Sequence, residues 1–469
     1  MRGRAAGAGL LVLAGALVAP STAAGHGLVG KQDLPIPLEL FAGAAAAVLV
    51  LSFVLLALLW PRPRLEQVWA RRLGPVPSVV DVVCGALGIA LFAVVVYSGL
   101  AGVQVGTANL APTFIYVLFW VGLVVVSLVF GDVFRLFNPW RAIARFFAWV
   151  ASRLARGGLP DPLPYPERLG HWPAVAGLLG FAWLELVYSG RDDPSTLAVL
   201  ALAYAAVQLA GMALYGIEAW TDRGDSFSVY FGLFARLSVW ERREGSLWFR
   251  APLAGSTRLE VLPGTVLLLC MMIGTTAFDG LSEGPLWSSV APELQQLFAD
   301  LGAGLDTALE LSFTIGLAVS VGFVFCLYRL GIEGMRLAGG GESARTLART
   351  FVHSLVPIAA AYVIAHYFSL LAYQGQAAAF LASNPLGEEA DLFGTASYQI
   401  DYTVVSANGI WYVQVAALVV GHVAALVLAH DRALARYGSL REATRSQYWM
   451  LGVMVSFTFL GLWLLSAAN

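Results

Sequence analysis

Charged residues are scarce in this chain of 469 residues, since Asp, Glu, Lys and Arg together make up only 12% of it. A soluble domain carries about 25% of such residues. Hydrophobic residues reach 58%, and the mean hydropathy is +0.73. These values exclude an ordinary water-soluble enzyme and indicate a surface that faces lipid. The net charge of −2 excludes the basic character of a nucleic-acid-binding protein.

Cysteines and catalytic motifs are also few. The chain has three cysteines, all in apolar runs and without a CxxC pair, so we interpret them as small buried hydrophobic residues. The sequence contains no Walker A, HExxH, GxSxG or CxxCH pattern. No loop is long enough to hold a soluble catalytic domain. Any chemistry therefore has to be found within or beside the apolar segments.

The first 25 residues have the pattern of a signal peptide. Arg2 and Arg4 precede an apolar run from Leu10 to Val18, and small residues follow up to Gly25. We predict a signal peptide over residues 1–25 and a single transmembrane domain over 26–469. Cleavage after Gly25 would leave His26 first, where its amine and imidazole bind copper only with a second nearby histidine, which the N-terminal segment lacks.

Ten later runs are long enough to cross a membrane at about 20 residues each. They lack the alternation of a β-barrel, so we expect an all-α polytopic membrane protein. The expected helices lie near residues 38–60, 79–100, 113–131, 172–190, 195–217, 265–283, 306–330, 351–373, 410–430 and 447–467.

The arginines predict the orientation of these helices. Twenty-four of them follow the first, third, fifth, seventh and ninth helices, whereas only Lys31 and Arg191 fall on the other face. Positive residues mark the cytoplasmic side of a plasma membrane protein, so both mature termini are expected outside. Two cytoplasmic segments, 134–154 and 227–237, mix aromatic residues with arginine and predict interfacial helices or helices packed on the bundle ends.

Four outer helix ends share an aromatic–polar–glycine pattern and suggest an internal repeat. Their aromatic residues are spaced by 91, 90 and 95 residues, which predicts two-helix hairpins repeated in one orientation. An interfacial aromatic residue and a terminating glycine also suit any helix end, which is the simpler interpretation. The four motifs are Tyr97-Ser98-Gly99, Tyr188-Ser189-Gly190, Phe278-Asp279-Gly280 and Tyr373-Gln374-Gly375.

Ionisable residues inside a bilayer are costly and mark candidate functional positions. Carboxylates from neighbouring helices together with a histidine can hold a divalent metal ion and activate its bound water. In that hypothesis Glu310 and His366 are also the catalytic residues. The alternative is that these side chains are solvated at headgroup depth or bond neighbouring helices. The candidate metal ligands are Glu185, Asp279, Glu310 and His366, and His422 is a further buried histidine.

Several strings resemble bacterial polytopic membrane proteins described as fenitrothion hydrolase-like. That resemblance implies hydrolysis of a phosphotriester P–O bond with release of a nitrophenol. It brings no catalytic motif that could be carried over to particular residues. The strings are 26–30 (HGLVG), 33–37 (DLPIP), 131–135 (GDVFR), 137–140 (FNPW), 276–280 (TAFDG), 421–423 (GHV) and 429–432 (AHDR).

Three functions therefore stay open at the level of sequence. The first is a hydrolase of apolar (phosphotri)esters at the outer side, with a small apolar substrate and a divalent metal. The second is a transporter or channel-like protein for a small solute, ion or proton. The third is a membrane anchor that binds a partner subunit through its arginine-rich segments.

Overall fold

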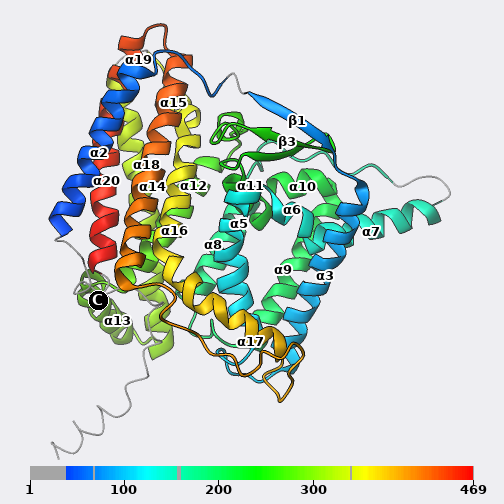
Figure 1. Cartoon of the computed structure of the whole chain (residues 1–469). Coiled ribbons are helices and arrows are strands. Elements are labelled where there is room, and N and C mark those ends of the chain that lie inside the picture. Colours follow the sequence, from blue (N-terminus) through cyan, green and yellow to red (C-terminus); the bar gives the residue numbers. More distant parts are fainter. Residues whose placement is uncertain (1–37, 67–68, 156–159, 339–340, 468–469) are drawn as a thin grey trace, which may run out of the picture.

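The computed structural model describes residues 38–66, 69–155, 160–338 and 341–467 (Figure 1). The expected signal peptide and His26 lie outside the described residues. Most of the described chain is helical, which confirms the prediction of an all-α polytopic membrane protein. Seven helices of this part are long and apolar enough to cross a membrane, and α2 and α8 contain shorter apolar stretches.

The helices of the first half begin with α2, and the span over residues 110–130 is one continuous helical run of α4, η2 and α5. They are α2 (Leu38–Leu59), α3 (Ser78–Ala101), α4 (Leu110–Pro112), η2 (Thr113–Gly122), α5 (Leu123–Phe130), α6 (Val133–Phe137), α7 (Pro139–Leu154), α8 (Trp172–Leu186), α9 (Pro194–Tyr215), α10 (Ile217–Arg223) and α11 (Ser226–Ala235). Of these, η2 is a π-helix. This form is rare in proteins, but where it occurs it is often at a functional site.

The second half holds the longest helices. They are η3 (Ser256–Arg258), α12 (Thr265–Ser282), α13 (Pro285–Asp300), α14 (Leu305–Ala338), α15 (Ala344–Phe351), η4 (Val352–Ser354), α16 (Leu355–Tyr373), η5 (Gln374–Gln376), α17 (Ala377–Ser383), α18 (Ala407–Arg436), α19 (Leu440–Ser446) and α20 (Tyr448–Ala467). A helix occupies each of the ten expected ranges, but α8 ends four residues early and α14 and α18 continue further.

The helices form two regions that lie side by side (Figure 1). In the packed region, α16 lies along α18, α12 along α14, and α2 from the start of the chain against α20 at its end. In the pocket region, which comprises α3 to α11, α3 pairs with α9 and α8 packs on α11. The two regions meet where α12 contacts α8 and α16 contacts η2 and α11.

A three-stranded antiparallel sheet caps one end of the bundle, with strand order β1-β3-β2 (Figure 1). Its strands are β1 (Ala70–Pro75), β2 (Trp240–Arg243) and β3 (Ser246–Arg250). We call this the arginine-rich end. Arg250 is buried there and donates hydrogen bonds to the backbone carbonyls of Ser238 and Ala235. The sequence did not indicate these strands, because short arginine-rich segments lack an apolar alternation.

The two segments expected to be interfacial helices differ in the structure. Helix α7 starts at Asn138, whose side chain accepts from the Arg141 backbone N–H, and it leaves Phe146, Phe147 and Trp149 exposed. That exposure fits a helix lying in the membrane interface. Helix α11 follows the other alternative, because all its residues except Gly232 are buried within the bundle.

Ion pairs tie α6, α7 and α10 together at the arginine-rich end. Glu218 of α10 pairs with Arg135, Arg141 and Arg145, at N–O distances of 2.6, 2.9 and 2.9 Å. Burial raises the pKa of Glu218, but the three guanidinium groups outweigh burial and hold the pKa below its usual value. The carboxylate therefore stays ionised and holds α6, α7 and α10 together at the arginine-rich end.

The four outer helix ends of the expected repeat do not share one environment. Tyr97 is 62% exposed, whereas Phe278 is 0% exposed and packs on Trp287 and Phe313. The internal repeat therefore stays a prediction.

Candidate functional site

A histidine–aspartate pair joins two helices inside the bundle. His366 of α16 and Asp279 of α12 lie with Nε2 and Oδ2 2.8 Å apart, and their side chains are only 6% and 5% exposed. The hydroxyl of Tyr367 also hydrogen-bonds to Asp279. A carboxylate that holds an imidazole in this way fixes the orientation of the ring, which suits proton transfer.

Glu185 lies next to this pair. It occupies the last turn of α8, close enough for its charge to interact with that of Asp279. The Trp120 side chain of η2 also lies near the Glu185 carboxylate. We name Glu185, Asp279, His366 and Tyr367 the carboxylate cluster. Three helices contribute to it, and none of its members is adjacent in sequence except His366 and Tyr367.

Glu310, the fourth predicted ligand, is held elsewhere. Its carboxylate accepts hydrogen bonds from the Ser189 backbone N–H at 3.1 Å and from the Ser189 hydroxyl at 2.8 Å. Within the described residues, no group of three or more His, Cys, Asp or Glu side chains is placed to hold a metal ion. The structure therefore brings Asp279 and His366 together with Glu185 nearby, and the metal site stays a prediction.

His422 is buried away from the pair. Its Nδ1 lies 2.7 Å from the Leu418 carbonyl oxygen, and its Nε2 has no hydrogen-bond partner in the described part of the chain. The rings of Tyr362 and Phe457 flank it, each with its centroid 6.4 Å away. His422 consequently fills space between α16, α18 and α20, and it does not extend the carboxylate cluster.

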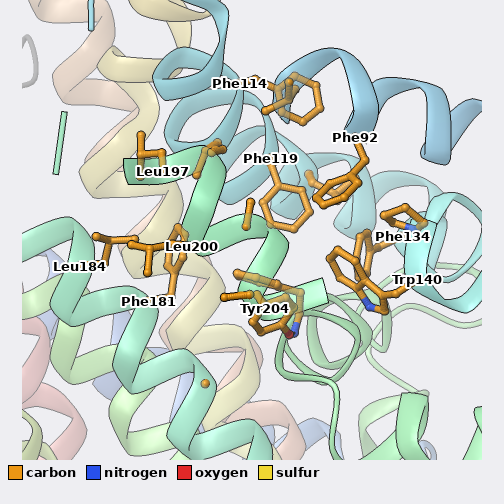
Figure 2. A pocket seen from close by; sticks show the side chains of 18 of the residues that line it. Phe92, Phe114, Phe119, Phe134, Trp140, Phe181, Leu184, Leu197, Leu200 and Tyr204 are labelled. Atoms are coloured by element: carbon orange, nitrogen blue, oxygen red, sulfur yellow. The ribbon is translucent and has the colours of Figure 1, made fainter. Parts of the chain in front are cut away.

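A large cavity lies on the other side of α8, in the pocket region (Figure 2). Its volume is about 830 Å³, and residues of α3, η2, α8 and α9 form most of its walls. Among the residues that the structure describes, no Asp, Glu, Lys or Arg lines it, and Glu185, Asp279, Glu310 and His366 are all absent from its walls. Labelled wall residues are Phe92, Phe114, Phe119, Phe134, Trp140, Phe181, Leu184, Leu197, Leu200 and Tyr204.

The cavity reaches the lipid-facing surface. Leu91 of α3 and Leu200 and Val207 of α9 line it and are also 48%, 41% and 58% exposed. Gly180 of α8 lines it too, and a Cβ atom added there would meet nothing within 4 Å. The apolar lining of the cavity is therefore continuous with exposed apolar side chains of α3 and α9.

A thin wall separates this cavity from the carboxylate cluster. Phe119 of η2 and Phe181 of α8 face the cavity, and Phe181 packs on Trp120 with ring centroids 4.7 Å apart. Trp120 in turn approaches Glu185. The π-helix η2 thus connects the two sites. Sequence reasoning missed the cavity; the only signal was the density of aromatic residues along 114–140 and 181–227.

No family model, curated protein or solved structure matches the chain, so the geometry of the site is interpreted from its own residues.

Proposed function

We propose that this protein is a membrane transport protein that takes a small, largely apolar molecule from the bilayer. The observation that carries the proposal is the uncharged cavity between α3, η2, α8 and α9, which adjoins exposed apolar side chains of α3 and α9. Its volume of about 830 Å³ falls within the range of roughly 300–1,000 Å³ that is usual for small-molecule sites. Exposed apolar side chains at its edge suit a ligand that arrives through lipid.

In this proposal the carboxylate cluster couples transport to protons. Ionisable side chains inside a membrane bundle are costly and are characteristic of proton relays in transporters. Gain or loss of a proton at Asp279 or His366 changes the hydrogen bonding of α12 and α16, which pack together. Glu185 and Trp120 would pass this change to the cavity wall.

An efflux assay tests the proposal. Membrane vesicles that contain the protein would be loaded with Nile red, an uncharged apolar dye, and energised with a proton gradient. We expect faster dye loss than from empty-vector vesicles, and loss at the empty-vector rate for Gly180→Trp, which fills the cavity. Gly322→Trp is the matched control, because Gly322 is exposed on α14 and also has open space around its Cβ position. Equal rates with and without the protein would refute the proposal.

A second candidate is hydrolysis of an apolar ester, which the His366–Asp279 pair favours. An imidazole oriented by a carboxylate can act as a general base on water. The resemblance to fenitrothion hydrolase-like proteins points the same way. Against it, neither residue lines the large cavity.

Nitrophenol release from fenitrothion by purified, reconstituted protein separates the two candidates. A hydrolase should release it, should lose activity in His366→Gln, and should respond to a chelator if the predicted metal takes part. Absence of release together with Nile red efflux would leave transport and exclude the esterase activity on this substrate.

A further inference from the structure

Asp225 lies behind two residues that line one end of the cavity, and it is 0% exposed. Oδ2 accepts hydrogen bonds from Asn138 Nδ2 at 2.8 Å and Trp140 Nε1 at 2.7 Å. Ser228 Oγ donates to Oδ2 at 2.6 Å, and Tyr204 Oη donates to Oδ1 at 2.8 Å. An oxygen pair that accepts from four donors matches the ionised carboxylate, which has acceptor sites only.

The charge of Asp225 is not balanced by a cationic partner among the described residues. Within the described part of the chain, no Arg, Lys or His forms an ion pair with it, and all four donors are neutral. Neutral donors spread the negative charge without cancelling it. The field of the carboxylate therefore extends into the neighbouring space, where low polarity leaves it poorly screened.

That neighbouring space is the aromatic end of the cavity. Two of the donors, Trp140 and Tyr204, line the cavity, with ring centroids 5.3 Å apart (Figure 2). Phe92 and Phe134 pack on Trp140 at 6.1 and 5.9 Å, and both also line the cavity. The indole N–H and the phenol O–H point to Asp225, so hydrogen bonding to an anion makes both rings richer in electrons.

We infer that this aromatic end binds the cationic group of a lipophilic monocation, such as an aryl-substituted quaternary ammonium ion. Aromatic faces attract such cations, and the attraction grows when water is excluded. The buried charge of Asp225 behind Trp140 and Tyr204 adds to it. The uncharged remainder of the cavity would hold the apolar body of the ligand. This inference rests on the proposed role of the cavity as a ligand site.

Two probes of the same shape distinguish the effect of positive charge on binding from the effect of apolar fit. They are 4-(trimethylammonio)biphenyl and 4-tert-butylbiphenyl, which differ essentially by one positive charge. Binding to the full-length protein in phosphatidylcholine nanodiscs would be measured, with empty nanodiscs subtracted. We expect the cation to bind about tenfold more tightly, as cation–π attraction in a desolvated site allows.

Variants then locate the effect. In Asp225→Asn the preference for the cation should fall to less than about threefold, with the neutral probe bound as before. Asp431→Asn is the matched control, because Asp431 is also 0% exposed and accepts from Trp60 and two backbone N–H groups, but lies in α18. Trp140→Leu removes one ring without removing the carboxylate, and it gives a second measurement if Asp225→Asn does not fold.

The outcomes distinguish failure of this inference from failure of the proposed function. Equal binding of both probes, or a preference that survives both Asp225→Asn and Trp140→Leu, overturns the inference and leaves the cavity as a site for neutral ligands. Failure of both probes to bind overturns the inference and the proposed function together.

Discussion

The pocket region and the packed region bury their helices by different means. In the packed region, small residues let backbones approach: a Cβ at Gly421 of α18 would lie 2.7 Å from the Pro357 carbonyl oxygen and 2.3 Å from the Ala361 Cβ. In the pocket region, Gly99 of α3 also lies close to α9, but around the cavity aromatic rings pack on one another between η2, α8 and α9. Helices in lipid associate through close packing, so bulky rings leave a cavity where small residues would close the gap.

Polar groups follow the same division. The packed region encloses the His366–Asp279 pair and His422, whereas the described walls of the cavity in the pocket region carry no charged residue. Asp225 lies just outside that cavity, and Glu185 lies between the regions. The buried His366–Asp279 pair and the cavity thus lie in different regions of the bundle.

The largest expected effect comes from breaking the pair in the packed region. Asp279→Ala should lower the free energy of unfolding by about 3–5 kcal/mol, because it leaves buried His366 and Tyr367 without their shared acceptor. Unfolding of the purified protein in mixed micelles with increasing SDS measures this change. Asp279→Asn, which keeps an acceptor oxygen, should lose less.

His422→Phe is the comparison for that variant. His422 is equally buried but its Nε2 has no partner, so an aromatic ring of similar shape should change the free energy of unfolding by only about 1 kcal/mol. Similar losses for Asp279→Ala and His422→Phe would show that the pair has no special role in stability.

One added methyl group should have opposite effects in the two regions. Gly421→Ala places its Cβ against Pro357 and Ala361, and we expect a loss of about 3 kcal/mol from overpacking. Gly180→Ala meets only open cavity and should be neutral or up to about 1 kcal/mol stabilising, because alanine favours the helix. The same SDS titration measures both. A loss of equal size at Gly180 would show that the cavity closes in the membrane.

The junction between the regions should respond to pH. His171, at the start of α8, is hydrogen-bonded to Thr265 of α12 through Nδ1 and Oγ1 2.9 Å apart. Burial, with help from Arg236 and Arg223, lowers the pKa of His171 to about 4. The folded state therefore binds this proton less readily than the unfolded state, so stability is full above about pH 6.5 and declines toward pH 4.

Between pH 7.5 and pH 5 this histidine should cost about 2 kcal/mol of stability. Melting curves of the wild type and of His171→Gln across that interval test the expectation. The variant should have a shallower pH dependence, with Thr265 still bonded to the glutamine. Parallel curves would mean that His171 does not titrate in this interval.

Much of the fold was accessible from composition and run length. Helices fall within all ten expected ranges because about 20 uninterrupted apolar residues have few alternatives in a bilayer. The sheet could not be predicted from the sequence, since Ala70 pairs with Arg250 across 180 residues of sequence and neither strand shows an apolar alternation. Packing of α11 on the bundle was predicted only as one of two alternatives, because a short aromatic helix has the composition of an interfacial helix.

The candidate site was accessible only in part. The cost of ionisable residues in lipid singled out Asp279 and His366, which the structure places in contact. It also singled out Glu310, which the structure turns toward Ser189. Asp225 was overlooked, because it lies between two helices and outside the apolar runs. The sequence therefore does not indicate that its carboxylate is buried.

The sequence by itself determined that this chain is a helical bundle in a membrane, because apolar runs of sufficient length can cross a bilayer only as helices. Tertiary structure decided which polar groups meet, since Asp279 and His366 are 87 residues apart and only the packing of α12 on α16 joins them. It also decided where space remains, because the cavity depends on the shapes of side chains from several separate helices. Contacts between distant segments leave no local pattern to find.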